Sequence, residues 1–327
     1  MSNKLEILKQ YTTVVADTGD FESGRAYNVQ DATTNPSLIL AACRKPEYDY
    51  LITSAIQYAK DKCQKNSKLD LLDVAMTKCL VNFGSEWLKF IPGVVSTEID
   101  ARLSFDAEAT VKKGKEIIEM YQEAGINKDR ILLKIAATWE GIQAAKVLES
   151  EGIKTNMTLI FSQVQAIASA QNAHATLISP FVGRILDWYK VAKKVEGFLP
   201  AEDPGVLSVK GIYAYFKKFG LKTIIMGASF RNVEEIEELA GCDNLTISPS
   251  LLQKLKDTPG PLERKLSPNG PWDENIKQFD IDEKKFRWLL NEDACATEKL
   301  SEGIRKFGCD IVTLENVLKA KIADLNK

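Results

Sequence analysis

The sequence contains almost no histidine, since His174 is the only one among 327 residues. This scarcity argues against a histidine-based mechanism, and we expect His174, which precedes a predicted strand, to be structural. The six cysteines lie far apart and form no CxxC pair, so neither residue type offers the usual ligands of a metal site. The sequence therefore predicts reduced, mostly buried thiols and no bound metal.

Long apolar runs and an excess of charge of one sign are also missing. No stretch approaches the roughly 18 apolar residues of a membrane helix, and the first nine residues carry too many charges for a signal peptide. The formal net charge of -2 gives no electrostatic reason to expect nucleic acid or an anionic membrane as a partner. We therefore expect a cytoplasmic protein that binds neither.

What the sequence does contain is an alternation of short β-branched runs with longer amphipathic stretches. This order is typical of parallel strands joined by helices, for example residues 108–123, where apolar residues recur at helical spacing behind an expected N-cap at Asp106. Eight strands are predicted, and eight is the number that closes a (β/α)8 TIM-type barrel. They centre on residues 13–16, 30–33, 94–97, 131–135, 154–159, 176–179, 223–226 and 245–247.

The length alone would suggest about two domains, but one barrel fits it as well. We expect a single (β/α)8 domain over residues 1–327. Residues 36–92 are longer than one crossover needs, which predicts more than one helix there. Residues 250–327 pass through a loop rich in proline and glycine and end in helical sequence. Both segments are interpreted as additions to the barrel.

Lys134 is the most informative residue, because it stands alone in the apolar run of residues 131–138. A buried amine must either lose its proton or pair with a carboxylate. An uncharged amine can attack a ketone and form a Schiff base, which accepts electrons while a neighbouring carbon–carbon bond breaks. The alternative is a structural lysine neutralised by a buried carboxylate, and Glu98 could be that partner.

Polar residues close most of the predicted strands, which is where barrel enzymes place their chemistry. Singly, some have ordinary explanations: Asp17 fits a turn, and Asn35 fits the N-cap of a helix that begins with Pro36. Their recurrence from strand to strand favours a site. The residues in question are Asp17, Thr33, Asn35, Glu98, Lys134, Asn156, Thr158 and Ser179.

Two arginines follow the sixth and seventh predicted strands in small-residue contexts, Arg184 after Gly183 and Arg231 close to Ser229. Loops after late barrel strands commonly bind phosphate, and guanidinium and hydroxyl groups match its oxygens. The alternative is a surface ion pair, such as Arg184 with Asp187 one turn later. The presence of both loops favours a site for a dianion.

The segments that carry these residues resemble transaldolase, in the same order along the whole chain, and most closely its long, dimeric form. The resemblance implies a Schiff-base enzyme that moves a dihydroxyacetone unit from sedoheptulose 7-phosphate or fructose 6-phosphate to glyceraldehyde 3-phosphate or erythrose 4-phosphate, in the pentose phosphate pathway. It also implies sugar phosphates as partners, a homodimer, and no cofactor. The segments are residues 16–20, 31–37, 96–104, 131–141, 177–188, 226–232 and 291–306.

The same resemblance implies a role for each candidate residue. Lys134 forms the Schiff base, and Asp17 takes the proton of the C4 hydroxyl as the C3–C4 bond breaks. Glu98 and Thr158 handle a catalytic water. The remaining residues bind substrate, with Thr33, Asn35, Asn156 and Ser179 at the hydroxyls of the three-carbon fragment and Arg184, Ser229 and Arg231 at the phosphate. Phe181 is a further substrate-binding residue.

Two alternatives stay open on the sequence alone. A related fructose 6-phosphate aldolase would release free dihydroxyacetone, but that group resembles a shorter barrel with Gln and Tyr at the positions of Glu98 and Phe181. A non-catalytic sugar-phosphate-binding barrel would keep the two arginines, yet it would need neither Lys134 nor Asp17.

Overall fold

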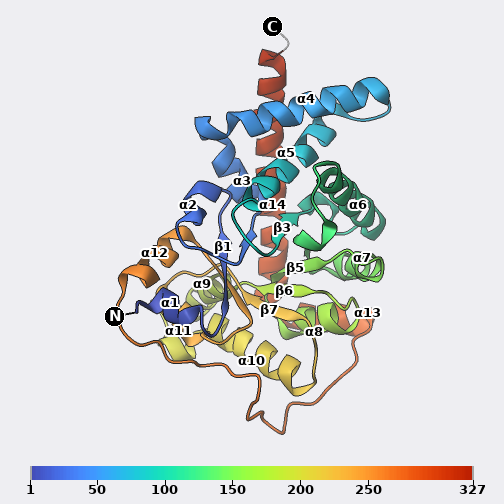
Figure 1. The fold of residues 1–327 in the computed structure, drawn as a ribbon. Helices are drawn as coiled ribbons and strands as arrows, with labels where there is room; N and C mark the ends of the chain where they lie inside the picture. The colour runs from blue at the N-terminus through green and yellow to red at the C-terminus, as the bar shows by residue number, and fades with distance from the viewer. Residues whose placement is uncertain (1, 326–327) are drawn as a thin grey trace.

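Eight parallel strands close into a barrel in the computed structural model, which describes residues 2–325 (Figure 1). Each strand pairs with the next along the chain, and the first pairs with the last. The predicted (β/α)8 barrel is confirmed. The strands are β1 (Thr13–Asp17), β2 (Asp31–Thr33), β3 (Val95–Glu98), β4 (Ile131–Ala136), β5 (Thr155–Ile160), β6 (Leu177–Pro180), β7 (Ile224–Gly227) and β8 (Asn244–Ile247).

Side chains alternate between the inside and the outside of the ring, as they must along any strand. Val15, Leu132, Leu177 and Met226 come from four different strands and form a small apolar cluster of their own. Contact between strands that are not neighbours places this cluster inside the ring. Lys134 lies two residues beyond Leu132 on β4, so its side chain points inward as well.

Helices connect the strands, and many of them begin at a side-chain cap. The expected helix near residue 108 runs from Ala107, and the Asp106 carboxylate caps it by accepting from the Ala109 N–H. The helices up to β7 are α1 (Lys4–Leu8), α2 (Phe21–Arg25), α3 (Pro36–Cys43), η1 (Pro46–Tyr48), α4 (Asp49–Lys65), α5 (Leu71–Trp87), η2 (Ala101–Leu103), α6 (Ala107–Glu123), η3 (Lys128–Arg130), α7 (Trp139–Ser150), α8 (Gln163–Gln171), α9 (Val182–Lys193), η4 (Pro200–Glu202) and α10 (Pro204–Lys218).

The later helices are α11 (Val233–Glu238), α12 (Pro249–Asp257), α13 (Glu283–Glu292) and α14 (Ala294–Asp324). Residues 36–92 and 250–327 thus hold additional helices, as predicted. The 31-residue α14 contacts α3, α5, η2, α9 and β5, and Figure 1 shows it in red, running from the barrel past α4 and α5. Between residues 2 and 325, no helix combines the length and the apolar character that crossing a bilayer requires.

Candidate active site

Lys134 and Glu98 face each other across two neighbouring strands. The β3–β4 register pairs the two residues directly, which brings Oε2 of Glu98 to 3.1 Å from Nζ of Lys134. Nζ also donates a hydrogen bond to the carbonyl oxygen of Thr34, at 3.3 Å. Both charged side chains are only 5% exposed, so the buried amine has the carboxylate partner that its burial demands.

Asp17, half-buried at the end of β1, is a second carboxyl beside the amine. It accepts a hydrogen bond of 3.2 Å from the Thr33 hydroxyl, which in turn lies 2.7 Å from the Thr246 hydroxyl. Burial raises the pKa of both Asp17 and Glu98, and the positive charge of Lys134 opposes that effect. A carboxylate with a raised pKa is a better proton acceptor, which suits it to general-base chemistry.

A chain of polar side chains crosses the barrel from β3 to β6. Ser179 donates to Oδ1 of Asn156 at 2.6 Å, and the Asn156 amide nitrogen donates to Oγ of Ser96 at 3.1 Å. Thr158 lies two residues beyond Asn156 on the same face of β5, and its buried hydroxyl has no hydrogen-bond partner within residues 2–325. An unpaired buried hydroxyl is a position where a water or a substrate oxygen can bind.

These side chains surround a cavity of about 50 Å3. It opens where the strands end, which is the catalytic end of barrel enzymes. Four of the predicted site residues are not among those that line the cavity, namely Glu98, Asn156, Thr158 and Arg231. The lining residues are Asp17, Thr33, Asn35, Lys134, Ser179, Phe181, Arg184, Met226, Ala228, Ser229 and Thr246.

Asn35 combines the two interpretations that the sequence offered for it. It lines the cavity, and its Oδ1 also accepts from the Leu38 N–H at 2.9 Å as the N-cap of α3, with Pro36 in the first turn. The cap fixes the side chain against the cavity wall.

Of the two predicted arginines, Arg184 lies in the first turn of α9 and Arg231 in the adjacent loop between β7 and α11. The Arg184 guanidinium lies over the rings of Phe181, at 5.0 Å, and of Phe307 in α14, at 5.5 Å. The alternative pairing of Arg184 with Asp187 is wrong, because Asp187 binds Arg231 instead, at 2.8 Å. Burial and the positive charge of Arg231 lower the pKa of Arg184, so an anion between the two cations would be stabilised by both.

Backbone contacts hold the start of α9 against the loop between β7 and α11. Gly183 N–H donates to the carbonyl oxygen of Ser229 at 3.1 Å, and a Cβ on Gly183 would lie 2.4 Å from that same oxygen. Only glycine permits this approach. Arg231 then folds back, and its Nη1 donates to the Ser229 carbonyl at 3.0 Å.

Comparison with known proteins agrees with this geometry. The family model described as Transaldolase/Fructose-6-phosphate aldolase matches residues 14–318. The chain belongs to this family. Among its relatives, the Transaldolase of Kluyveromyces lactis is 58% identical over 325 residues, covering 98% of this chain and 96% of the relative. The Transaldolase of Actinobacillus pleuropneumoniae is 54% identical (98% and 100% covered), and the Probable transaldolase of Dictyostelium discoideum is also 54% identical (98% and 99%). The resemblance seen in the sequence is confirmed.

Some residues of this transaldolase-family site were missed by the sequence analysis. Ser96 and Thr246 are polar residues inside strands β3 and β8 and point toward the polar groups described above. Strand alternation was the available signal, because Ser96 shares the face of Glu98, two residues later. Met226 and Ala228 line the cavity as apolar residues, for which the sequence offered no chemical signal.

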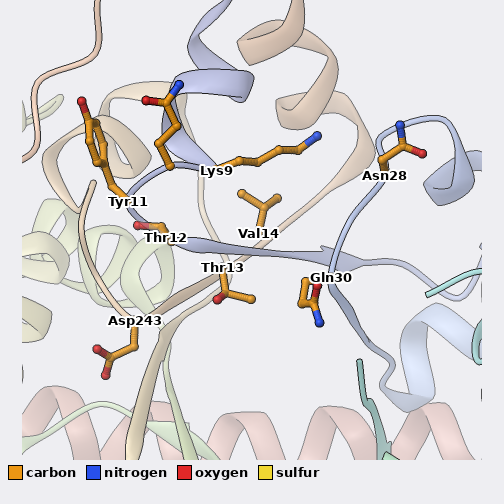
Figure 2. Close-up of a pocket in the computed structure, with 9 residues that line it drawn as sticks. Lys9, Tyr11, Thr12, Thr13, Val14, Asn28, Gln30 and Asp243 are labelled. Atoms are coloured by element: carbon orange, nitrogen blue, oxygen red, sulfur yellow. The ribbon is translucent and has the colours of Figure 1, made fainter. Parts of the chain in front are cut away.

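A wider hollow, of about 450 Å3, lies around the start of β1 in this member of the transaldolase family (Figure 2). Its charged groups already have partners. The Lys9 amine binds Glu6 and the carbonyl oxygen of Tyr27, both at 2.8 Å, and Asp243 binds Lys217 at 2.7 Å. The hollow is at the amino ends of the strands, where barrels do not place their chemistry, so we assign it no catalytic role.

Proposed function

We propose that the chain is a transaldolase that transfers a dihydroxyacetone unit between sugar phosphates in the non-oxidative pentose phosphate pathway. The donor is sedoheptulose 7-phosphate or fructose 6-phosphate, and the acceptor is glyceraldehyde 3-phosphate or erythrose 4-phosphate. The observation that carries the proposal is the buried Lys134 amine, 3.1 Å from Glu98 and lining the same cavity as Asp17. Relatives named Transaldolase that match nearly the whole chain support it.

The first step joins the donor to Lys134. Nζ attacks the C2 ketone to give a carbinolamine, which loses water to form a protonated Schiff base. We assign to Glu98 the transfer of protons to and from that water, because its oxygen lies 3.1 Å from Nζ and burial raises its pKa. The unpaired hydroxyl of Thr158 is a suitable anchor for the same water.

The second step breaks the sugar. Asp17 removes the proton of the C4 hydroxyl, the C4 oxygen becomes the carbonyl of the departing aldehyde, and the electrons of the C3–C4 bond move into the iminium to give an enamine. Desolvation raises the pKa of Asp17 and thereby improves it as a base. Its hydrogen bond from Thr33 fixes the direction of the carboxylate.

The enamine must survive until an acceptor aldehyde arrives. The buried side chains of Thr33, Asn156 and Ser179, with Asn35 on the cavity wall, can bind the hydroxyls and carbonyl-derived atoms of the fragment. A cavity of only about 50 Å3 leaves little room for water and so limits premature protonation. Attack of the enamine on the new aldehyde, return of the proton from Asp17 and hydrolysis of the Schiff base complete the transfer.

The phosphate of either substrate would lie between Arg184 at the start of α9 and Arg231 in the loop between β7 and α11. Arg184, Ser229 and Arg231 supply two guanidinium groups and one hydroxyl there, and Phe181 supports the Arg184 guanidinium through its ring. Charge-assisted hydrogen bonds of this kind hold phosphate tightly and in one orientation. One such site can serve donor and acceptor in turn.

Borohydride reduction tests the proposal directly. The protein is incubated with fructose 6-phosphate, reduced and mapped by peptide mass spectrometry. We expect the three-carbon label on Lys134 alone, and a Lys134→Met protein should bind the sugar phosphate without label or transfer. Label on another lysine, or none, would contradict the assignment. Steady release of dihydroxyacetone without an acceptor would instead favour a fructose 6-phosphate aldolase.

We also propose that residues 1–327 form one domain, that the chain acts as a homodimer and that it works in the cytoplasm. The family match over residues 14–318 and the contacts of α14 with α3, α9 and β5 support the first point. The other two depend on the resemblance and stay predictions. Light scattering after gel filtration and cell fractionation test them.

A further inference from the structure

Glu235, in the first turn of α11, is a buried carboxyl that the proposed mechanism does not use. It is 1% exposed. Its Oε2 accepts a hydrogen bond of 2.6 Å from the backbone N–H of Arg231, one of the proposed phosphate-binding residues. Its Oε1 is buried and meets no hydrogen-bond donor within residues 2–325 while the carboxyl is ionised. An ionised Glu235 would therefore leave one oxygen unsatisfied.

Asp203 is a second buried acid beside Glu235. It is 4% exposed and caps α10, accepting from the N–H groups of Gly205, at 2.7 Å, and Val206, at 3.3 Å. Its side chain also hydrogen-bonds to the side chain of Glu235. Two carboxyl groups can hydrogen-bond only when one of them carries a proton. Both acids accept backbone hydrogen bonds, but Oε1 of Glu235 has no other partner in the described part of the chain, so we place the shared proton on that oxygen.

The proton is exchangeable near neutral pH. Burial raises the pKa of Glu235 to about 7, and the negative charge of Asp203 adds to this rise, whereas the hydrogen bond from Arg231 opposes it. The other charged groups that act on the pair are the Arg231 guanidinium, which lowers the pKa of Glu235, and the Asp187 carboxylate on α9, which raises the pKa of Asp203.

The loop that contains Ser229 and Arg231 has an unfavourable backbone conformation at Ser229. Ser229 has a φ of 61°, in the left-handed region that serine seldom adopts. Arg231 donates from its guanidinium to both the carbonyl and the hydroxyl oxygen of Ser229, at 3.0 and 3.3 Å. A local conformation of this kind persists only when surrounding bonds fix it, and the bond from Arg231 N–H to Glu235 is one of them.

We propose that Glu235, sharing a proton with Asp203, is a positioning residue for the substrate phosphate: it holds the backbone of Arg231 so that Ser229 and Arg231 face the dianion, and its proton keeps a negative charge away from that dianion. This inference rests on the proposed phosphate site. When the proton leaves, two adjacent carboxylates repel each other, and a negative charge is added beside the bound dianion. Both effects weaken phosphate binding as pH rises.

Sulfate inhibition tests the inference, because sulfate stays a dianion across neutral pH, whereas phosphate titrates. The inhibition constant of sulfate against fructose 6-phosphate is measured from about pH 6 to about pH 8.5. In the wild-type protein we expect it to rise roughly fivefold with pH, as one added charge nearby would cause. Glu235→Gln, which keeps a donor for Asp203 and gains no charge, should lose most of this rise with kcat nearly unchanged.

Two further variants sharpen the test. Glu234→Gln removes the same charge from the exposed neighbouring position and should behave as wild type. Asp203→Asn should move the midpoint of the rise in the inhibition constant to lower pH, because an amide does not repel an ionised Glu235. This variant also tests the proposal if Glu235→Gln fails to fold. A flat wild-type profile, or an unchanged profile in both Glu235→Gln and Asp203→Asn, overturns the inference. Absence of sulfate competition at every pH, with an unchanged KM in Arg231→Ala, overturns the phosphate site itself.

Discussion

Nζ of Lys134 and Oε2 of Glu98 lie 3.1 Å apart on strands whose register sets the two residues opposite each other. The spacing is thus a property of the strand pairing rather than of a flexible loop. A nucleophile and its proton acceptor placed on rigid elements need little rearrangement before reaction.

Glu98→Gln keeps the shape of this side chain but removes the proton acceptor. We expect Schiff-base formation to slow by roughly 10²- to 10⁴-fold, the range typical of general acid–base catalysis. The KM for phosphorylated substrates should change little, because Arg184 and Arg231 are untouched. The rate of borohydride trapping after rapid mixing measures the effect, and trapping at the wild-type rate would remove Glu98 from the mechanism.

Asp17→Asn should separate the two chemical steps. Without the Asp17 carboxylate the C4 hydroxyl keeps its proton, so the C3–C4 bond stays intact while Lys134 still condenses with the ketone. Reduction should therefore trap the whole six-carbon sugar phosphate on Lys134, a mass distinct from that of the three-carbon fragment. Recovery of the three-carbon label at an undiminished rate would show that another base cleaves the bond.

The same variant should stabilise the folded protein at neutral pH. Burial raises the pKa of Asp17 above its ordinary 3.8, so the folded state holds this proton more tightly than the unfolded chain does. The ionised carboxylate therefore destabilises the fold above the raised pKa, and this effect fades as pH falls toward 3.8. Tm measurements should show a gain for Asp17→Asn at about pH 8 that shrinks as pH falls toward 3.8. A gain in Tm that increases as pH falls would contradict the raised pKa of Asp17.

Arg184→Ala should discriminate between phosphorylated and unphosphorylated substrates. A charge-assisted hydrogen bond contributes about 1.5–3 kcal/mol, so KM for the phosphorylated acceptor should rise roughly 10- to 150-fold. Transfer to an unphosphorylated aldehyde should fall far less. Arg184→Lys restores the charge without the planar fork and should recover part of the loss. Equal losses with both acceptors would place the phosphate elsewhere.

Gly84 in α5 tests the packing behind β3. A Cβ there would lie 1.8 Å from the hydroxyl of Tyr121, which is fully buried and lies 2.6 Å from the Thr97 hydroxyl. Gly84→Ala should lower the free energy of unfolding by about 1–3 kcal/mol in urea denaturation, and by less in a Tyr121→Phe background. Gly197→Ala is the control, since its Cβ would meet nothing within 4 Å.

The barrel could be predicted because its signals are local. All eight strands begin and end within one residue of the expected positions, as short β-branched runs between polar caps allow. The inward-facing site residues followed from the same alternation, since Lys134 and Glu98 each end or interrupt an apolar strand. Their catalytic roles came from the resemblance to transaldolase, because strand periodicity predicts which way a side chain points and not what it does.

What could not be predicted depends on contacts between distant segments. Arg184 lies over Phe307 of α14. Asp187 forms an ion pair with Arg231, although Arg184 is closer to it in the sequence. The sequence around Arg184 does not indicate that this residue will contact α14, a helix that begins more than a hundred residues later. The pairing of Asp203 with Glu235 has the same origin, because it forms only when α10 and α11 pack.

The seam of the barrel joins Thr13 to Asn244, two residues that lie far apart in the sequence. During synthesis β1 therefore waits for its second partner until β8 has emerged, and every partial ring exposes two open strand edges. Contacts between such distant segments also slow folding. The native ring has no free edge, so the risk of aggregation should be concentrated in the nascent chain, where a chaperone that shields strand edges would have its largest effect.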